Sequence, residues 1–373
     1  MTDLTIIILS AGNSTRFGTT HKKQWLRIGT APLWKFVADR LGKALHTENI
    51  IITAHKNEIS YMQKHGNYTI VQGGESRQES LKEAIANVNT PYVLVTDVAR
   101  SCVDHAMLKR IVDAKEKADI IVPYLPVSDT VVYHEETIDR DSVKLIQTPQ
   151  LSKTSVLKEA LKQQKLYTDD SSAIKANGGT VFYEKGSINA KKITVFDDLS
   201  MLECLKAPSQ QLFTGTGFDV HQFCENKTMV LGGVKIDSEL GFKAHSDGDV
   251  AIHALIDALL GAIGGGDIGE LYPDTDSKNK NIDSKVMLKE VVTFINQVGF
   301  IINNVDITIM AQKPKISPYK QQMREVLASI LKLEPIFVNI KATTTEKLGF
   351  VGRKEGVAVQ AAATLQYYNW KRT

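Results

Sequence analysis

The chain up to about residue 200 alternates short apolar runs with segments in which apolar residues recur at helical spacing. Strands that are apolar throughout are typical of a mostly parallel sheet with helices on both faces. The predicted strands are Leu4–Leu9, Asn49–Ala54, Tyr68–Val71, Tyr92–Thr96 and Ile120–Pro123, and the predicted helices include Pro32–Lys43 and Gln78–Ala86. This pattern predicts an α/β domain, in which ligands bind at the carboxyl ends of the strands, where Ser10, Gly73 and Asp97 fall.

The alternation stops at Leu205–Gln211, where a proline stands among small and polar residues. Such a segment ends a helix and is typical of a linker. The elements predicted after it are strands at 212–220, 305–311, 337–343 and 355–366 and helices at 249–262, 282–298 and 319–332. Their order indicates an α+β domain. Because 373 residues exceed the usual size of a single core, we predict a first domain at 1–207, a linker at 208–211 and a second domain at 212–373.

Composition and charge exclude several classes of protein. A net charge of +3 gives no general affinity for nucleic acid, and no apolar run is long enough to span a membrane. The apolar start Thr5–Leu9 lacks a basic region before it, which favours a buried strand over a signal peptide. Cys102, Cys204 and Cys224 are far apart and form no CxxC motif, which argues against a disulfide framework and against a thiolate metal site. A cytoplasmic location is the expectation.

Two segments of the second domain carry residues that bind metal ions. Asp219 and His221 are two residues apart, so on a strand both side chains leave the same face. His253 follows Asp249 by four residues, in a segment with a helical pattern. One carboxylate and two imidazoles leave a fourth ligand position open, as in catalytic zinc sites. Each histidine alone is more often solvated or hydrogen-bonded, but the set, in its Gly- and Asp-rich context, favours a zinc site.

A loop of small residues, Leu9–Gly18, lies between the first predicted strand and a helix. Such loops present backbone N–H groups to phosphate. The loop is neither GxGxxG nor a Walker A sequence, so it supports neither a dinucleotide fold nor a P-loop. Arg16, with Lys22 and Lys23 beyond it, supplies positive charge that suits a triphosphate and the charge developing on a transferring phosphorus. The alternative is a plain strand–helix loop with basic surface residues.

An ordered series of motifs accompanies this loop over about residues 1–205. The motifs are Lys23-Gln24, Gly73–Ser80, Asp97–Arg100, Pro126–Thr130, Thr148–Gln150 and Thr168–Asp170. In this order they resemble the 2-C-methyl-D-erythritol 4-phosphate cytidylyltransferases. The resemblance implies a Rossmann-like nucleotidyltransferase fold. It also implies transfer of CMP from CTP to methylerythritol phosphate, by in-line attack on the α-phosphorus with release of pyrophosphate.

The resemblance implies roles for single residues of the first domain. Arg16, Lys23 and Lys192 would be catalytic, and Asp97 would lie near the ribose and a Mg²⁺ or Mn²⁺ ion. The residues implied to bind the nucleotide are Ala11, Gly12, Gly74, Glu75 and Ser80, and those implied around the methylerythritol phosphate are Arg100, Thr130, Arg140 and Lys192. In the family, the arm that carries Thr130 and Arg140 reaches into the site of a dimer partner.

Three residues depart from the family's pattern. Ser14 stands where the loop usually has its second glycine, Lys22 stands where a proline usually precedes the catalytic lysine, and Val98 replaces an alanine. None of these changes removes a catalytic group. Two adjacent lysines leave open which one is catalytic, and the spacing to Gln24 favours Lys23.

A second ordered series spans about residues 213–368. Its motifs are Gly217–His221, Ala244–Asp249, Gly266–Gly269, Tyr272–Asp276 and Lys341–Phe350. They resemble the 2-C-methyl-D-erythritol 2,4-cyclodiphosphate synthases. The resemblance implies that the 2-phosphate of a CDP-methylerythritol 2-phosphate attacks the β-phosphorus and releases CMP. Taken singly, the threonine run is also a plain strand end, and Asp267 is also a turn residue beside glycine.

This second resemblance also implies residue roles. Asp219, His221 and His253 would hold Zn²⁺, and Glu346 would be catalytic by holding Mg²⁺ or Mn²⁺ between the α- and β-phosphates. The implied substrate-binding residues are His245, Ser246, Asp267, Ala311, Lys315, Thr343, Thr344, Phe350 and Arg353. Arg353 matches a residue that lines a cavity on a threefold axis, because family members are homotrimers with sites between subunits.

We therefore predict two enzymes of the methylerythritol phosphate route to isoprenoid precursors in one chain. Their steps are not consecutive, since a kinase must act between them. No kinase loop is present, so that kinase is expected to be a separate protein in transient contact at most. Dimeric and trimeric contacts in one chain predict a homo-oligomer, such as a hexamer. The alternatives are another nucleotidyltransferase fused to a zinc-binding module, and a zinc-binding scaffold protein.

Overall fold

The computed structural model describes residues 3–163, 165–273, 275–279 and 282–371. The chain forms two compact units, one of Met1–Pro208 with Trp370–Thr373 and one of Ser209–Asn369. Trp370 therefore belongs to the first unit, where its indole Nε1 donates a hydrogen bond of 2.8 Å to the carbonyl oxygen of Arg27. Nothing in the apolar pattern indicated this return of the chain's end.

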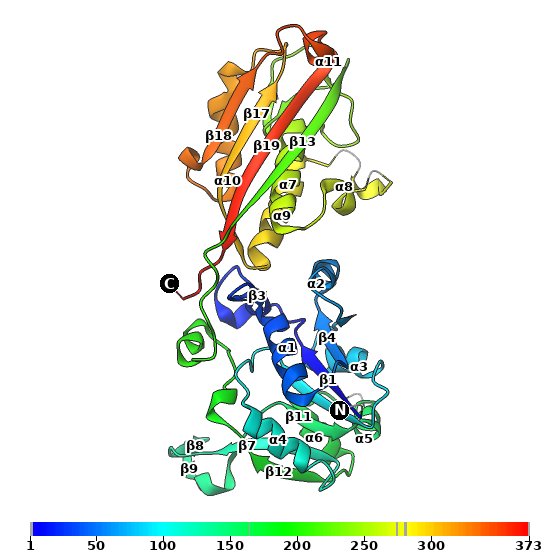
Figure 1. Ribbon diagram of the computed structural model, residues 1–373, viewed down its shortest axis with the longest axis vertical. Helices are drawn as coiled ribbons and strands as arrows, with labels where there is room; N and C mark the ends of the chain where they lie inside the picture. Colours follow the sequence, from blue (N-terminus) through cyan, green and yellow to red (C-terminus); the bar gives the residue numbers. More distant parts are fainter. Residues whose placement is uncertain (1–2, 164, 274, 280–281, 372–373) are drawn as a thin grey trace. The chain divides into compact units, whose positions relative to one another are not determined.

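Within the described residues, the first unit contains an eight-stranded sheet in the order β10-β7-β11-β6-β1-β4-β5, with β12 beside β7 (Figure 1). Its strands are β1 (Leu4–Leu9), β4 (Ile50–Ala54), β5 (Thr69–Gln72), β6 (Tyr92–Asp97), β7 (Ile120–Pro126), β10 (Lys144–Ile146), β11 (Gln150–Lys153) and β12 (Val181–Lys185). β6, β1, β4 and β5 run parallel, whereas β10 and β11 pair antiparallel. The predicted strands and the mostly parallel sheet are confirmed.

Helices cover both faces of this sheet, which is why β1 is buried along its whole length. α3 (Arg77–Ile85), α5 (Thr154–Ala160) and α6 (Asp170–Ala176) contribute to a core that contains Ile7 and Leu9 of β1. α1 (Leu33–Leu45) and α4 (His105–Asp113) cover the opposite face, and the short α2 (Ile59–Gln63) packs beside β5. The two helices predicted in this domain are therefore confirmed as α1 and α3.

Cys102 and Cys204 form a disulfide, with their Cα atoms 5.8 Å apart. The spacing of the cysteines argued against a disulfide framework, and for this pair that interpretation was wrong. Their separation of 102 residues along the chain concealed their proximity, because the fold returns the chain beside the loop that follows β6. Cys224 is free.

The second unit contains a five-stranded sheet in the order β16-β13-β19-β17-β18. Its strands are β13 (Leu212–Cys224), β16 (Gly241–Phe242), β17 (Phe300–Met310), β18 (Val338–Thr343) and β19 (Gly356–Tyr367). α7 (Val250–Ile263), α9 (Ser284–Gln297) and α10 (Lys320–Leu331) pack on one face (Figure 1). Smaller elements are the hairpin β14 (Met229–Leu231) and β15 (Val234–Ile236) and the short helices α8 (Ile268–Leu271) and α11 (Gly349–Gly352). The predicted α+β order is confirmed.

Two glycines allow α7 to lie close against β13. A Cβ atom on Gly217 would meet the carbonyl oxygen of Ala254 at 2.0 Å, and one on Gly215 would meet that of Ala258 at 2.1 Å. Side chains do not tolerate such contacts, so glycine at both positions is what allows α7 to approach β13 this closely. Asp219 and His221 follow on the same face of β13, at the end of the strand where α7 begins.

The helices of both units are short. α7 and α9 have 14 residues each, and a membrane-spanning helix needs about 20. Within the described part of the chain, no helix combines the length and the apolar character that crossing a bilayer requires.

Candidate active sites

A cavity of about 540 Å³ opens at the carboxyl ends of β1, β4, β5 and β6. It lies where a parallel sheet is expected to bind ligands. Its lining includes nine of the predicted site residues, namely Ala11, Gly12, Arg16, Lys23, Gly74, Glu75, Ser80, Asp97 and Lys192. Residues that are far apart in sequence thus meet around one space.

Ser14 fits the loop despite the missing glycine. Its backbone lies in the left-handed region, with φ at 55°, which a glycine adopts without steric cost. Its hydroxyl accepts a hydrogen bond of 3.0 Å from the backbone N–H of Lys23 and donates one of 3.2 Å to Gln24 Oε1. The serine therefore connects this loop to the turn that carries Lys23.

The two adjacent lysines have opposite environments. Lys22 is buried and forms an ion pair with Glu58, which is 1 % exposed. Lys23 lines the cavity, and its Nζ donates a hydrogen bond of 2.6 Å to the carbonyl oxygen of Ile193. Of these two lysines, Lys23 is therefore the one that faces a ligand in this cavity.

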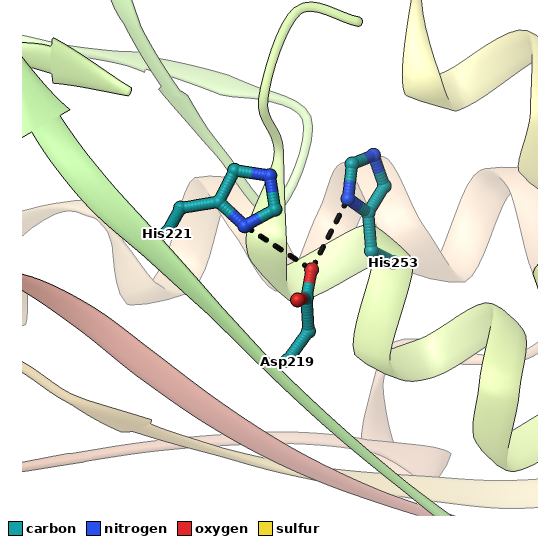
Figure 2. Close-up of side chains that lie close together, drawn as sticks. All are labelled: Asp219, His221 and His253. Carbon is teal, nitrogen blue, oxygen red and sulfur yellow. Dashed lines mark hydrogen bonds and ion pairs between the residues drawn. The ribbon is translucent and has the colours of Figure 1, made fainter. Parts of the chain in front are cut away.

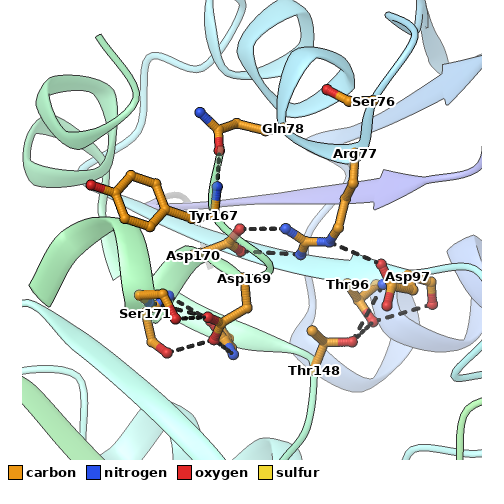
Figure 3. Close-up of polar contacts among 12 residues, drawn as sticks. Ser76, Arg77, Gln78, Thr96, Asp97, Thr148, Tyr167, Asp169, Asp170 and Ser171 are labelled. Carbon is orange, nitrogen blue, oxygen red and sulfur yellow. Dashed lines mark hydrogen bonds and ion pairs between the residues drawn. The ribbon is translucent and has the colours of Figure 1, made fainter. Parts of the chain in front are cut away.

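A network of charged side chains joins Arg77 and Asp97, which line the cavity, to Asp170 of α6 (Figure 3). Arg77 Nη1 lies 2.7 Å from Asp170 Oδ1, and Arg77 Nε lies 3.3 Å from Asp97 Oδ1. Lys192 Nζ lies 2.7 Å from the other oxygen of Asp97. Burial alone would raise the pKa of Asp97, but Arg77 and Lys192 outweigh it and hold that pKa below its ordinary value. Arg77 and Asp170 belong to motifs identified in the sequence, but no role was predicted for either residue.

A second cavity of about 440 Å³ adjoins the first. It is lined by the predicted residues Arg100 and Lys192, together with Thr148 and Asp169. Arg77, Asp97 and Lys192 line both cavities. Arg100 Nη1 donates a hydrogen bond of 2.6 Å to the carbonyl oxygen of Ala190, and burial lowers the pKa of this guanidinium.

Thr130 and Arg140 lie apart from both cavities. They flank the hairpin of β8 (Val131–Tyr133) and β9 (Glu136–Ile138), and both are exposed. Arg140 Nη1 donates a hydrogen bond of 2.7 Å to the carbonyl oxygen of Ser128. Within this chain, the structure does not bring them to the residues that they were predicted to join.

Asp219 and His221 of β13 meet His253 of α7 in the second unit (Figure 2). Asp219 Oδ2 lies 3.2 Å from the Nδ1 atom of each histidine. Burial would raise the pKa of Asp219, but both histidines outweigh it and hold that pKa well below its ordinary value. His221 Nδ1 is buried and, apart from this 3.2 Å ion pair with Asp219, has no hydrogen-bond partner among the described residues. One carboxylate and two nitrogens that converge in this way fit the ligand set of a divalent metal ion.

Neighbouring polar groups orient this set. The buried carboxylate of Asp249 accepts hydrogen bonds from the N–H groups of Ala251 and Ile252 at the start of α7 and from those of Gly232 and Gly233. It thereby fixes the helix turn that carries His253. The other ring nitrogen of His253, Nε2, lies 3.2 Å from Ser246 Oγ and 3.0 Å from Ser284 Oγ.

The remaining predicted residues near this group are more open. His245 is exposed, and Asp267 is an exposed residue that caps α8 through the N–H of Glu270. Asp257, which sequence reasoning did not single out, accepts a hydrogen bond of 2.8 Å from the N–H of Ile268. Burial raises the pKa of this carboxyl. Asp274 of the quoted motif lies outside the described residues.

A separate group forms at the ends of β17 and β18. The backbone N–H of Ala311 donates to the carbonyl oxygen of Thr343, and Thr344 Oγ1 donates a hydrogen bond of 2.7 Å to Glu346 Oε1. Lys315 is exposed in the connection after β17, and Phe350 lies on α11. Arg353 is paired with Glu355 at 2.8 Å.

The sheet register separates this group from the metal-ligand set. Asp219 is opposite Val359, which is opposite Ile309, which in turn is opposite Ala342, the neighbour of Thr343. Three strand spacings amount to about 14 Å. Within one chain, Glu346 and its neighbouring threonines are therefore not part of the Asp219 group.

Comparisons with known proteins match both units. A family model for 2-C-methyl-D-erythritol 4-phosphate cytidylyltransferase matches residues 4–206, and a model for the YgbB family matches residues 212–366. The bifunctional enzyme IspD/IspF of Aliarcobacter butzleri (strain RM4018) is 56% identical over 373 residues and covers 100% of both chains. That of Sulfurimonas denitrificans is 55% identical over 369 residues, covering 99% of this chain and 96% of the relative.

A solved structure agrees with these matches. The bifunctional IspDF from Campylobacter jejuni has a TM-score of 0.89 and 48% identity, over 99% of this chain and 100% of that one. The predicted fold class, a nucleotidyltransferase domain followed by a cyclodiphosphate synthase domain, is confirmed. Enzymes of these two kinds use divalent metal ions generally, and the Asp219, His221 and His253 group can hold one. The chain belongs to the family of bifunctional IspD/IspF enzymes, which combine the cytidylyltransferase and the cyclodiphosphate synthase of isoprenoid precursor synthesis.

Proposed function

We propose that the two adjoining cavities of the first unit bind the two substrates of cytidylyl transfer, CTP in the larger and 2-C-methyl-D-erythritol 4-phosphate in the smaller. The observation that carries this proposal is that Arg77, Asp97 and Lys192 line both cavities. An oxygen of the 4-phosphate forms a bond to the α-phosphorus of CTP, while the bond from that phosphorus to pyrophosphate breaks. We propose 1–207 as the domain for this reaction, joined by the linker 208–211 to a cyclase domain at 212–373.

Arg16 and Lys23 supply positive charge where the transferring phosphorus becomes more negative. Phosphoryl transfer relies on positioning and electrostatic stabilisation more than on covalent catalysis. Lys192 joins the nucleotide side to the acceptor side, since this residue lines both cavities. Asp97 is a carboxylate that suits a Mg²⁺ or Mn²⁺ ion arriving with CTP. Ala11, Gly12, Gly74, Glu75 and Ser80 border the nucleotide, and Arg100 holds the acceptor phosphate.

The transfer reaction is expected to slow in alkali. Burial lowers the pKa of Lys23 to about 8, and repulsion by Lys192 and Arg16 acts in the same direction. The attraction of Asp97 offsets only part of this shift. Below that pH Lys23 carries its charge, and above it the charge is lost. We expect kcat/KM for CTP to be level on the acid side and to fall as pH rises through about 8, measured as pyrophosphate release. A Lys23→Arg variant, which stays protonated, should lack this alkaline fall, and an unchanged fall in that variant would contradict the assignment.

For the second unit, we propose cyclisation of 4-diphosphocytidyl-2-C-methyl-D-erythritol 2-phosphate. An oxygen of the 2-phosphate bonds to the β-phosphorus, and the bond from that phosphorus to CMP breaks. Asp219, His221 and His253 would hold Zn²⁺, which when bound polarises a phosphate oxygen. His245 and Ser246 contact the phosphates, and Asp267 contacts the hydroxyl groups of the erythritol.

The cyclase site is proposed to be shared between subunits of a homotrimer. Ala311, Lys315, Thr343 and Thr344 would bind the CMP portion, and Glu346 would hold Mg²⁺ or Mn²⁺ between the α- and β-phosphates. This group lies about three strand spacings, or ~14 Å, from Asp219 in the same chain, which supports completion of each site by a neighbouring copy. Phe350 borders the site, and Arg353 faces the threefold axis. Thr130 and Arg140 would likewise reach a dimer partner's transferase site, so a hexamer satisfies both contacts.

A mixing experiment tests the shared site. Asp219→Asn and Glu346→Gln should each abolish most CMP release when expressed alone. Co-expressed in equal amounts, they should recover about a quarter of the wild-type rate. Each site takes Asp219 from one chain and Glu346 from its neighbour, and with random assembly both are intact in about one site of four. The control is co-expression of two differently tagged Asp219→Asn chains. If the mixture is no more active than either variant, the site is complete within one chain and the proposal fails.

The two reactions are not consecutive, so the first product must leave this protein to be phosphorylated. We propose that a separate kinase does this and makes at most transient contact with the chain. The rival function is another nucleotidyltransferase fused to a zinc-binding scaffold module. Incubation with CTP and methylerythritol phosphate, following pyrophosphate, and with the CDP 2-phosphate derivative, following CMP, distinguishes the two. Failure of both releases would favour the rival.

A further inference from the structure

We propose that Glu58 is a positioning residue for cytidylyl transfer, because its buried carboxylate holds the residues on both sides of Lys23 and so directs Lys23 into the nucleotide cavity. Glu58 stands at the end of the turn η3 (Lys56–Glu58), which follows β4, far from Lys23 in sequence. It belongs to none of the motifs that the sequence carries. The inference rests on the proposed role of Lys23.

Three donors converge on this one carboxylate. Lys22 Nζ forms a close ion pair with Oε1, Trp25 Nε1 donates a hydrogen bond of 2.6 Å to Oε2, and Gln24 Nε2 donates one of 3.4 Å to the same oxygen. Glu58 is 1 % exposed and Trp25 is fully buried. The carboxylate thus receives the side chains of residues 22, 24 and 25, while the side chain of residue 23 is left to face the cavity.

Three of these residues form the turn η2 (Lys23–Trp25). The turn is also held by the loop after β1 that contains Gly12 and Ser14. Gln24 Nε2 also donates a hydrogen bond of 3.0 Å to the carbonyl oxygen of Gly12, and the hydroxyl of Ser14 receives the backbone N–H of Lys23. Gln24 therefore connects Glu58 to the loop that carries Arg16. This chain thus holds the turn through the side chains of Ser14 and Lys22 as well.

Packing makes Trp25 a firm anchor for the turn. Its ring lies 5.2 Å from that of Tyr61 and 6.0 Å from that of Trp34, measured between centroids. The Glu58 carboxylate accepts the hydrogen bond of the buried indole N–H and so ties this anchor to the end of η3. Small displacements of a catalytic group cost much of its effect, about 10²-fold for 1 Å. A looser turn is therefore expected to lower kcat although Lys23 itself is intact.

The test compares Glu58→Gln with the wild-type full-length chain. The expected result is a fall in kcat of cytidylyl transfer of roughly 10- to 100-fold, a change in KM for CTP of less than about threefold, and an unchanged cyclase rate. The matched control is Asp119→Asn. Asp119 holds Lys153 at 3.1 Å and the backbone N–H of Thr180 at 2.9 Å, but lines neither cavity. That variant should lower the unfolding temperature and leave kcat unchanged.

A double variant keeps the proposal testable if Glu58→Gln does not fold. Lys22→Met with Glu58→Leu replaces the buried ion pair with apolar groups, a change that is often neutral for stability. It removes the acceptor for Gln24 and Trp25, so kcat should remain at least about 10-fold low in a folded protein. A folded Glu58 variant or double variant with kcat within about twofold of wild type would overturn the proposal. Lys23→Ala is measured alongside. If Lys23→Ala stays active, the proposed role of Lys23 fails. If Lys23→Ala is inactive while the folded Glu58 variants are active, only the proposed role of Glu58 fails.

Discussion

Lys23→Ala is expected to slow cytidylyl transfer by about 10²–10³-fold, the usual cost of removing one preorganised group that stabilises a developing charge. Lys23 is mostly buried, its Nζ is held at 2.6 Å from the carbonyl oxygen of Ile193, and it lines the cavity of about 540 Å³. Water cannot replace an ammonium group fixed in that way. Arg16→Ala should have a loss of similar size, because Arg16 faces the same cavity.

The cyclase rate of the same protein is the internal control, since both substitutions lie in the first unit. Lys109→Ala is a control for general surface effects, because Lys109 is exposed and its ammonium group pairs with Asp113 one turn further along α4. The measurement is steady-state pyrophosphate release at saturating CTP and methylerythritol phosphate. Near-normal transfer by Lys23→Ala would falsify the catalytic role of Lys23 and would favour Lys22 as the catalytic lysine.

His253→Ala is expected to lose both the bound metal and CMP release, whereas Glu346→Gln should keep that metal and lose most turnover. His253 supplies one of the two nitrogens that converge with the Asp219 carboxylate, all within 4.8 Å of one another. Glu346 lies beyond β18, about three strand spacings or ~14 Å away in the same chain. Loss of one of three protein ligands usually abolishes tight zinc binding, whereas loss of a distant carboxylate does not.

Elemental analysis of the purified variants separates these outcomes from activity alone. Cytidylyl transfer should persist in both, because both residues lie in the second unit. His105→Ala, an exposed histidine at the start of α4, is the control for loss of a histidine as such. Stoichiometric zinc and full CMP release in His253→Ala would show that Asp219, His221 and His253 do not form the metal site.

The sequence by itself determined the elements and the chemistry that lies close along the chain. Leu4–Leu9 is apolar at every position, and the structure buries it on both faces, because a strand between two helical layers needs no polar side. Asp219 and His221 share a face because strand side chains alternate. Local spacing also predicted the small-residue loop that carries Arg16 and the α/β and α+β orders of the two units. The ordered motifs indicated the family of each unit.

Only the tertiary structure decided which distant residues meet. It brought Glu58 to Lys22 and Trp25, bonded Cys102 to Cys204, and returned Trp370 to Arg27. It also kept Glu346 away from Asp219, because the register of four strands sets that distance. Such contacts depend on strand order and on the course of the chain between elements, and hydrophobic periodicity reports neither. For this reason the sequence predicted most of the groups that line the sites, whereas the residues that hold those groups in place emerged only from the fold.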